Sequence, residues 1–249
     1  MTSQLPPLPL EASHLINAFI QGLLEILSNN LYGIYMYGAG VFPDSGPLLD
    51  IDCHVIIRQS LTEAERAAYL AMLSELKVRF PALGEQLDAY VILLEAAKGH
   101  QIPQHQVLFD IYDHSWALHC AHVRAGYYRV LYGPEPDEIF PNPTWDSIDG
   151  ALQHELKFVL DHPQYPAYGI LNLCRILYSY ETKNPAVSKQ FSGRWGQSRF
   201  PEWAPLIQAA RRFYYKEHTP QDLAWMEWKR EAFFSFMQVR MSASRELTI

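Results

Sequence analysis

The sequence predicts a mixed α/β (α+β) sheet domain over residues 1–143 and an all-α helical bundle domain over residues 144–249. Two observations lead to this fold class. The first part alternates stretches of helical periodicity with short β-branched and aromatic runs, in the order helix, strand, strand, helix, strand. The second part shows helical periodicity alone. A chain of 249 residues can bury two such cores, and the Pro-rich stretch FPNPTW at 140–145 marks the predicted boundary.

The elements of the first part follow from local signals. Helical spacing that stops at an Asn pair predicts a helix over 10–30, and the aromatic run LYGIYMYG predicts a strand over 31–38. Residues 38–49 are rich in Gly, Pro, Asp and Ser and predict a loop. Thr62 and Glu65 have the spacing of a capping box, which predicts a helix over 61–80. Apolar and β-branched runs predict two further strands, over 50–58 and 86–95.

The second part divides into periodic segments separated by Pro-bearing breaks such as DHPQYPAY and RFPEWAP. Because proline interrupts a helix, each break is expected to end one helix and precede the next. The predicted helices cover about 145–160, 168–182, 188–198, 202–217 and 220–242. Residues 96–125 give no clear pattern.

Charge and composition restrict the function. Residues 1–143 hold 16 acidic and 7 basic side chains, whereas residues 144–249 hold 11 and 13. An acidic first half is a poor partner for nucleic acid and would attract cations or metal ions. No segment has the length and apolarity of a membrane span or the pattern of a signal peptide. Three widely spaced cysteines are typical of free thiols in a reducing compartment, so we expect a cytoplasmic protein.

The stretch YGAGVFPDSGPLLDIDCHVII at 37–57 carries the clearest chemical signal. Its glycines allow backbone N–H groups to approach an anion such as a phosphate. Asp50 and Asp52 alternate on one strand and so share a face, where they offer oxygen ligands to Mg²⁺. Asp88, on the next predicted strand, would assist the metal or accept a proton. An Asp-x-Asp pair is also common as a surface or turn feature, and that alternative stays open.

Several segments together resemble the streptomycin/spectinomycin adenylyltransferases of the nucleotidyltransferase superfamily. GAGVFPDSGPLLDID is similar to the family's glycine turn followed by Asp-x-Asp, and LYGPEPDEIFPNP at 131–143 resembles its interdomain stretch. YGILNLCRILYSYETKNPAVSKQFSGRW at 168–195 resembles its C-terminal segment, with a Leu-x-x-x-Arg-Ile-x-Tyr-Ser helix, a Lys and a Trp. The resemblance implies a nucleotidyltransferase domain before a helical bundle, with ATP and the acceptor in the cleft between the two.

The resemblance also implies roles for individual residues. Asp50 and Asp52 would bind Mg²⁺, and Asp88 would be the general base and a possible third metal ligand. Gly38 and Ala39 would bind the nucleotide through the backbone, and Arg175 and Lys189 would contact its phosphates. The implied reaction moves AMP from ATP to a hydroxyl of a small, cationic, aminoglycoside-like acceptor and releases pyrophosphate, which would confer antibiotic resistance.

Three departures keep alternatives open. Ala39 replaces the family's serine, and Asp88 is one methylene shorter than its glutamate. Tyr165 and Tyr168 stand where the family's Trp and Asp recognise the acceptor. The chain could therefore use a different acceptor, or be a catalytically weak nucleotide-binding protein. Without the resemblance, we would expect Arg175 to form a salt bridge or a helix cap and Lys189 to lie exposed on the surface.

His119 and His122 could share a helix face, and we interpret this pair as structural rather than metal-binding.

Overall fold

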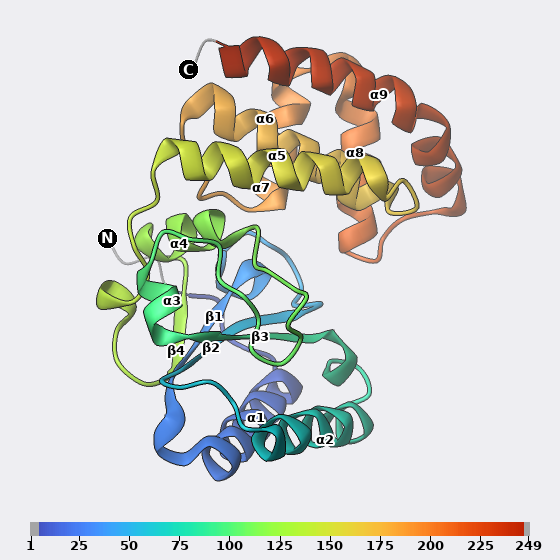
Figure 1. The fold of residues 1–249 in the computed structure, drawn as a ribbon. Coiled ribbons are helices and arrows are strands. Elements are labelled where there is room, and N and C mark those ends of the chain that lie inside the picture. The colour runs from blue at the N-terminus through green and yellow to red at the C-terminus, as the bar shows by residue number, and fades with distance from the viewer. Residues whose placement is uncertain (1–4, 247–249) are drawn as a thin grey trace. The chain divides into compact units, whose positions relative to one another are not determined.

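The computed structural model describes residues 5–246 and divides into two compact units. The first unit runs up to Pro43 and continues over Leu48–Ser147. The second unit begins at Ile148 and also includes the short segment Asp44–Pro47. Figure 1 shows that strands occur in the first unit and that the second is built from helices.

The first unit contains a four-stranded mixed sheet in the order β3-β2-β1-β4. β1 runs antiparallel to β2 and to β4, whereas β2 and β3 are parallel. Three of the strands lie where the sequence predicts them. β4 falls in a stretch for which no strand was predicted. The strands are β1 Leu31–Tyr37, β2 Ile51–Ile57, β3 Leu87–Leu93 and β4 Arg129–Tyr132.

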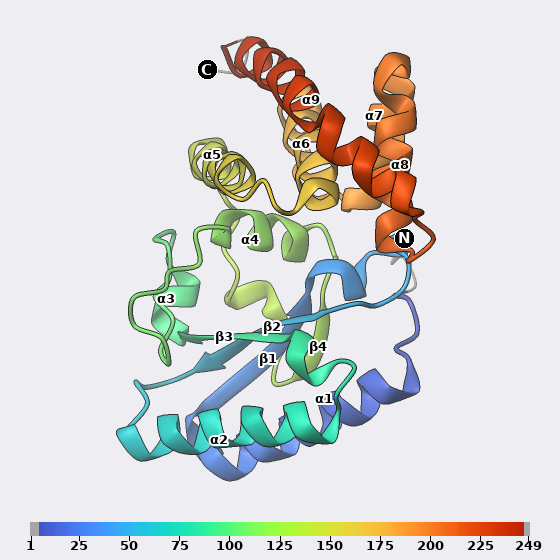
Figure 2. The same ribbon diagram turned by 90° about the vertical axis from the view of Figure 1, so that its right-hand side faces the viewer.

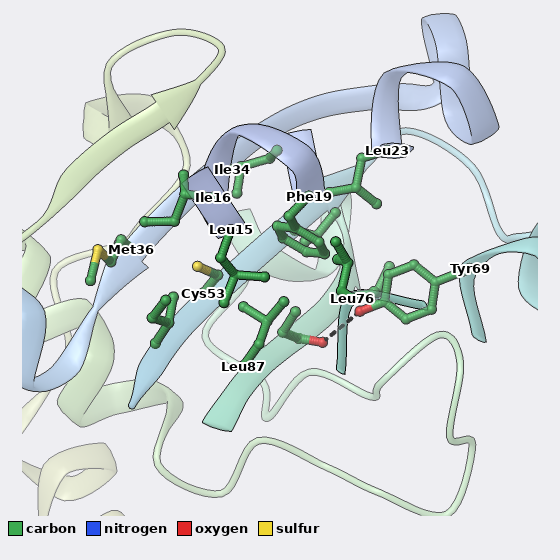
Figure 3. Close-up of a cluster of buried hydrophobic side chains, with 14 of the residues drawn as sticks. Leu15, Ile16, Phe19, Leu23, Ile34, Met36, Cys53, Tyr69, Leu76 and Leu87 are labelled. Carbon is green, nitrogen blue, oxygen red and sulfur yellow. Dashed lines mark hydrogen bonds between the residues drawn. The ribbon is translucent and has the colours of Figure 1, made fainter. Parts of the chain in front are cut away.

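One face of this sheet is covered by α1 Leu10–Leu27 and α2 Glu63–Arg79, as Figure 2 shows. The core between them is shown in Figure 3, where Phe19 and Leu23 of α1 lie among strand residues such as Ile34. Tyr69 of α2 is buried there because its hydroxyl donates a hydrogen bond of 3.1 Å to the carbonyl oxygen of Ala89. The predicted capping box at the start of α2 is present.

The opposite face carries α3 Leu94–Lys98 and α4 Trp116–Arg124. Its core includes Tyr35 of β1, Ile56 of β2 and Ile92 of β3. Because side chains alternate along a strand, residues two or four positions from these also point to this face. Tyr37, Asp52 and Asp88 therefore belong to the face of the sheet that carries α4.

The helical unit is arranged around α6, which is buried along most of its length and contacts α7, α8 and α9. Pro166 occupies the first turn of α6, where its missing N–H costs nothing, and Lys183 ends the helix in a left-handed conformation. All the predicted helices are found, with shifted ends. They are α5 Trp145–Asp161, α6 Pro166–Thr182, α7 Lys189–Arg199, α8 Ala204–Tyr214 and α9 Pro220–Glu246.

The remaining described elements are short 3-10 turns at Ser28–Asn30, Gly38–Val41, Gly84–Gln86, Pro136–Glu138 and Pro201–Trp203. The turn at Gly38–Val41 directly follows β1, within the predicted loop. Among residues 5–246, no helix combines the length and the apolar character that crossing a membrane requires.

Candidate active site

The two carboxylates predicted on neighbouring strands lie directly beside each other. Asp52 of β2 is the register partner of Asp88 in the parallel strand β3. On its other side, Asp52 is the partner of Tyr37, the last residue of β1. Partners in register project to the same face with neighbouring side chains, so the three form one row across the sheet. The sequence placed these acids on adjacent strands, and the register brings them together.

Asp50 immediately precedes β2, two residues before Asp52. Its carboxylate oxygen Oδ1 is buried and has no hydrogen-bond partner among the residues that the structure describes. A buried carboxylate oxygen without a donor is costly, because it loses water and gains nothing in return. Asp50 thus supplies an oxygen that a cation would satisfy. Asp50, Asp52 and Asp88 would together offer Mg²⁺ the oxygen ligands that this ion prefers.

The glycine turn touches this row through Gly38. Its φ of +70° lies in the left-handed region, which favours glycine. A Cβ at this position would lie 2.0 Å from Oδ2 of Asp52. The backbone therefore approaches the carboxylate more closely than any side chain would allow. Gly38 is required here both by its conformation and by the position of Asp52.

The negative charges of the row affect one another. Desolvation of its carboxyl by the surrounding protein raises the pKa of Asp88, although the residue as a whole is exposed to solvent. The charges of Asp113 and Asp50 raise it further, and His119 opposes them. Burial and then the charge of Asp52 raise the pKa of the Tyr37 hydroxyl well above its usual range. The row therefore carries excess negative charge, and a bound cation would reduce the repulsion between its carboxylates.

A second polar cluster, which the sequence analysis missed, lies on the same face. Oδ2 of Asp113 lies 3.0 Å from Nε2 of His54 and 2.9 Å from Nδ1 of His119. His54 is fully buried and Asp113 nearly so. The ring of Tyr37 lies 4.2 Å from each histidine ring, which connects the cluster to the acidic row. His119 belongs to this cluster, whereas the ring of His122 packs edge-on against Phe42.

The cluster holds a buried negative charge. Burial alone would raise the pKa of Asp113, but the charge and hydrogen bonds of His119 and His54 outweigh it and lower that pKa. Burial lowers the pKa of His54 to about 4, against the opposing effect of Asp113. The ligand atoms of the three residues lie within 4.8 Å of one another, a spacing that could hold a metal ion.

A metal at that cluster would need Nε2 of His54 to exchange its bond to Asp113 for the ion. The other ring nitrogen, Nδ1, would then carry the proton. Nδ1 is buried and has no hydrogen-bond partner in the described part of the chain. Metal-binding histidines normally donate that proton to an acceptor, which Nδ1 lacks. We therefore interpret the cluster as a hydrogen-bonded network that supports the acidic row.

The predicted cations lie together in the helical unit. Nη2 of Arg175 lies 3.3 Å from Oε2 of Glu155, an ion pair in which both side chains are mostly buried. Nζ of Lys189 lies 4.5 Å from the centre of the Tyr168 ring and 5.5 Å from that of Tyr214. The Tyr168 hydroxyl in turn donates to Glu155. Arg175 thus forms the salt bridge that the sequence left as an alternative, and Lys189 stacks on aromatic rings.

The two tyrosines at the predicted acceptor positions differ in environment. Tyr165 is 54% exposed, whereas Tyr168 is half-buried in the hydrogen-bonded cluster around Glu155. Tyr168 is therefore part of the internal structure of the helical unit. Tyr165 presents an aromatic surface to solvent.

Comparisons with known proteins show which proteins the chain is similar to. Residues 137–240 match the family model for the C-terminal domain of aminoglycoside adenylyltransferases. The fold is similar to that of spectinomycin adenyltransferase AAD(9) from Enterococcus faecialis, in a structure with ATP and spectinomycin. The TM-score is 0.76 at 18% identity, over 92% of this chain and 99% of that one. No curated protein matches the sequence significantly.

The likeness in fold confirms the mixed-sheet domain followed by helices, and the family match makes residues 137–240 similar to the C-terminal domain of aminoglycoside adenylyltransferases. The resemblance to aminoglycoside adenylyltransferases is confirmed in the part of the chain where the sequence motif is most distinctive, around Arg175. The family match begins at residue 137 and therefore covers Arg175 and Lys189 but none of the three aspartates of the sheet. The roles of individual residues stay predictions.

Proposed function

We propose that this protein transfers AMP from ATP to a hydroxyl of a small cationic acceptor such as an aminoglycoside, and releases pyrophosphate. The observation that carries the proposal is the row of Asp52 and Asp88 in register, with Gly38 against Asp52 and the buried oxygen of Asp50 nearby. The comparison with AAD(9), whose structure contains ATP and spectinomycin, supports the choice of donor and acceptor.

In this reaction Asp50 and Asp52 would hold Mg²⁺, which would neutralise phosphate charge and orient the phosphates. The acceptor oxygen would bond to the α-phosphorus while the bond from that phosphorus to the pyrophosphate oxygen breaks. Asp88 would accept the proton that the acceptor hydroxyl loses. A carboxylate with a raised pKa holds this proton better, which suits a general base.

Further residues are assigned to the nucleotide by the family resemblance. The N–H groups of the turn at Gly38 and Ala39 would contact phosphate oxygens, as glycine-rich turns do. Arg175 and Lys189 would supply positive charge, on which phosphoryl transfer depends. Ala39 offers no hydroxyl, so the backbone and the two cations would carry more of the binding.

A cationic acceptor is favoured by charge. The first half of the chain carries 16 acidic side chains against 7 basic ones, and its acidic row attracts positive groups. The identity of the acceptor does not transfer from the family, because Tyr165 and Tyr168 replace the residues that recognise it. A polyol of another class is therefore the second candidate. Action in the cytoplasm belongs to the same proposal and agrees with the buried free thiols of Cys53, Cys120 and Cys174.

A catalytically weak nucleotide-binding protein is the third candidate, favoured by Ala39 and by the short side chain of Asp88. A screen separates the three. Pyrophosphate release is measured with ATP and Mg²⁺ in the presence of aminoglycosides and then of other polyols. We expect release that depends on an aminoglycoside. Release with another polyol alone would change the acceptor, and thermal stabilisation by ATP without any release would indicate a binding protein.

A further inference from the structure

We propose that Glu155 of α5 is a positioning residue for the nucleotide, because it fixes both of the cations that would bind the triphosphate. This inference rests on the proposed function, in which Arg175 and Lys189 contact phosphate. Glu155 itself would not touch the nucleotide. No sequence motif pointed to it, and it acts entirely within the helical unit.

Three side chains of α6 converge on one oxygen of Glu155. Oε2 accepts hydrogen bonds from the Tyr168 hydroxyl at 3.1 Å, from Nδ2 of Asn172 at 2.7 Å and from Nη2 of Arg175 at 3.3 Å. Positions 168, 172 and 175 are four and three residues apart, so they share one face of the helix. Glu155 therefore determines how this face of α6, Arg175 included, is presented.

Asn172 shows how strongly Glu155 orders the cluster. Asn172 is fully buried, and both hydrogen bonds of its Nδ2 go to Glu155 and Tyr168. Its carbonyl oxygen Oδ1 is buried without a hydrogen-bond partner in the described residues. An unsatisfied buried oxygen is costly. The hydrogen bond that Nδ2 of Asn172 donates to the charged carboxylate of Glu155 offsets this cost.

The influence of Glu155 reaches Lys189 through Tyr168. The Tyr168 hydroxyl is fixed by Glu155, and its ring lies 4.5 Å from the ammonium of Lys189. Lys189 begins α7, and the ring of Tyr214 from α8 lies 5.5 Å away. The faces of the Tyr168 and Tyr214 rings attract the ammonium without accepting conventional hydrogen bonds from it. The N–H groups of Lys189 therefore stay available to donate to a phosphate. One carboxylate thus orders a flexible lysine and an arginine from different helices.

The experiment compares Glu155→Ala, Glu155→Gln and Tyr168→Phe with the matched control Asp149→Ala. Asp149 is also on α5, also accepts from a tyrosine, Tyr180, and also pairs with an arginine, Arg245. Within residues 5–246, the side-chain hydrogen bonds of Asp149 go to Tyr180 and Arg245, not to either candidate cation. Steady-state kinetics give KM for ATP and kcat, calorimetry gives ATP affinity, and thermal unfolding gives stability.

We expect Glu155→Ala to raise KM for ATP about tenfold or more, with kcat changed less, because a charged acceptor of three donors is lost. Glu155→Gln should raise KM by a smaller factor, since its amide oxygen still accepts hydrogen bonds. Tyr168→Phe should also raise KM, by loosening only the link to Lys189. Asp149→Ala should lower thermal stability and leave KM for ATP unchanged.

The proposal is overturned if Glu155→Ala and Tyr168→Phe change KM for ATP no more than Asp149→Ala does. If Glu155→Ala does not fold, Glu155→Gln and Tyr168→Phe decide by the same comparison. Arg175→Ala and Lys189→Ala distinguish a failure of the Glu155 proposal from a failure of the proposed phosphate-binding roles. If these raise KM while the Glu155 variants do not, Glu155 alone loses its role. If they too leave KM unchanged, the phosphate-binding roles of the proposed function fail, and the inference fails with them.

Discussion

Gly38 determines where the carboxylate of Asp52 can lie. The left-handed φ of +70° ends β1, and the absence of a side chain lets Oδ2 of Asp52 occupy the space that a Cβ would fill. The glycine of this turn is thus a geometric requirement of the acidic row as well as a possible anion-binding backbone. Ala39, the next residue, has an ordinary conformation.

Replacing Gly38 by Ala should therefore lower activity strongly, although it adds only one methyl group. The left-handed conformation costs about 1–2 kcal/mol in a residue with a Cβ, and the methyl group would displace the Asp52 carboxylate. We expect a large loss of turnover with a modest fall in melting temperature, measured by pyrophosphate release and thermal unfolding. Ala39→Ser is the control and should retain activity. A Gly38→Ala variant with normal turnover would show that the position of Asp52 is not critical.

At this scale the sequence revealed part of the site. Asp50 and Asp52 were predicted because alternation on a strand places them on one face, and Asp88 because it lies within the next predicted strand. His54 follows in the same alternation and could have been identified as a member of that face. Asp113 could not, since it lies in the stretch 96–125 that has no readable periodicity. Glu155 was hidden because its partners are set by the packing of α5 against α6.

Among the elements, α4 is connected to β2 by the network of His54, Asp113 and His119 rather than by apolar contacts alone. The carboxylate of Asp113 also accepts a hydrogen bond from the backbone N–H of Ser115, just before α4. Because Asp113 is charged, buried and bonded to two histidines, it fixes the helix against the face that holds the acidic row.

Asp113→Asn should destabilise the first unit by about 2–4 kcal/mol, since it leaves the two histidines without a charged acceptor in a buried place. Its matched control is Asp110→Asn, an exposed aspartate in the same loop that should have almost no effect. Urea unfolding of both variants at neutral pH provides the comparison. Equal stabilities for the two variants would mean that the network does not hold α4.

Two of the elements that the sequence failed to predict, β4 and α3, are missed for the same physical reason. β4 has only four residues and lies at an edge of the sheet, so its pattern is too short to show alternation. α3 has five residues, which is below the length at which helical periodicity can be recognised. Longer elements with complete patterns, such as α2 with its capping box, were predicted to within four residues.

At the scale of the whole molecule, the residues to which the proposal assigns roles are distributed over both units. The sheet unit provides the three aspartates and the glycine turn, and the helical unit provides Arg175 and Lys189. The charges of the sequence are divided in the same way, with a net negative first half and a slightly positive second half. Local patterns identify each set of residues, but they contain no information on long-range packing such as the network around Glu155.

The central claim is that the aspartates of the sheet catalyse a metal-dependent AMP transfer. The most direct test is mass spectrometry of an aminoglycoside acceptor incubated with ATP, Mg²⁺ and either the unaltered protein or Asp52→Asn. We predict that the acceptor gains one adenylyl group with the unaltered protein. We predict no such product with Asp52→Asn, although the variant stays folded, and none when a chelator removes the metal. Adenylylated acceptor formed at the normal rate by Asp52→Asn, or in the presence of the chelator, would contradict the account.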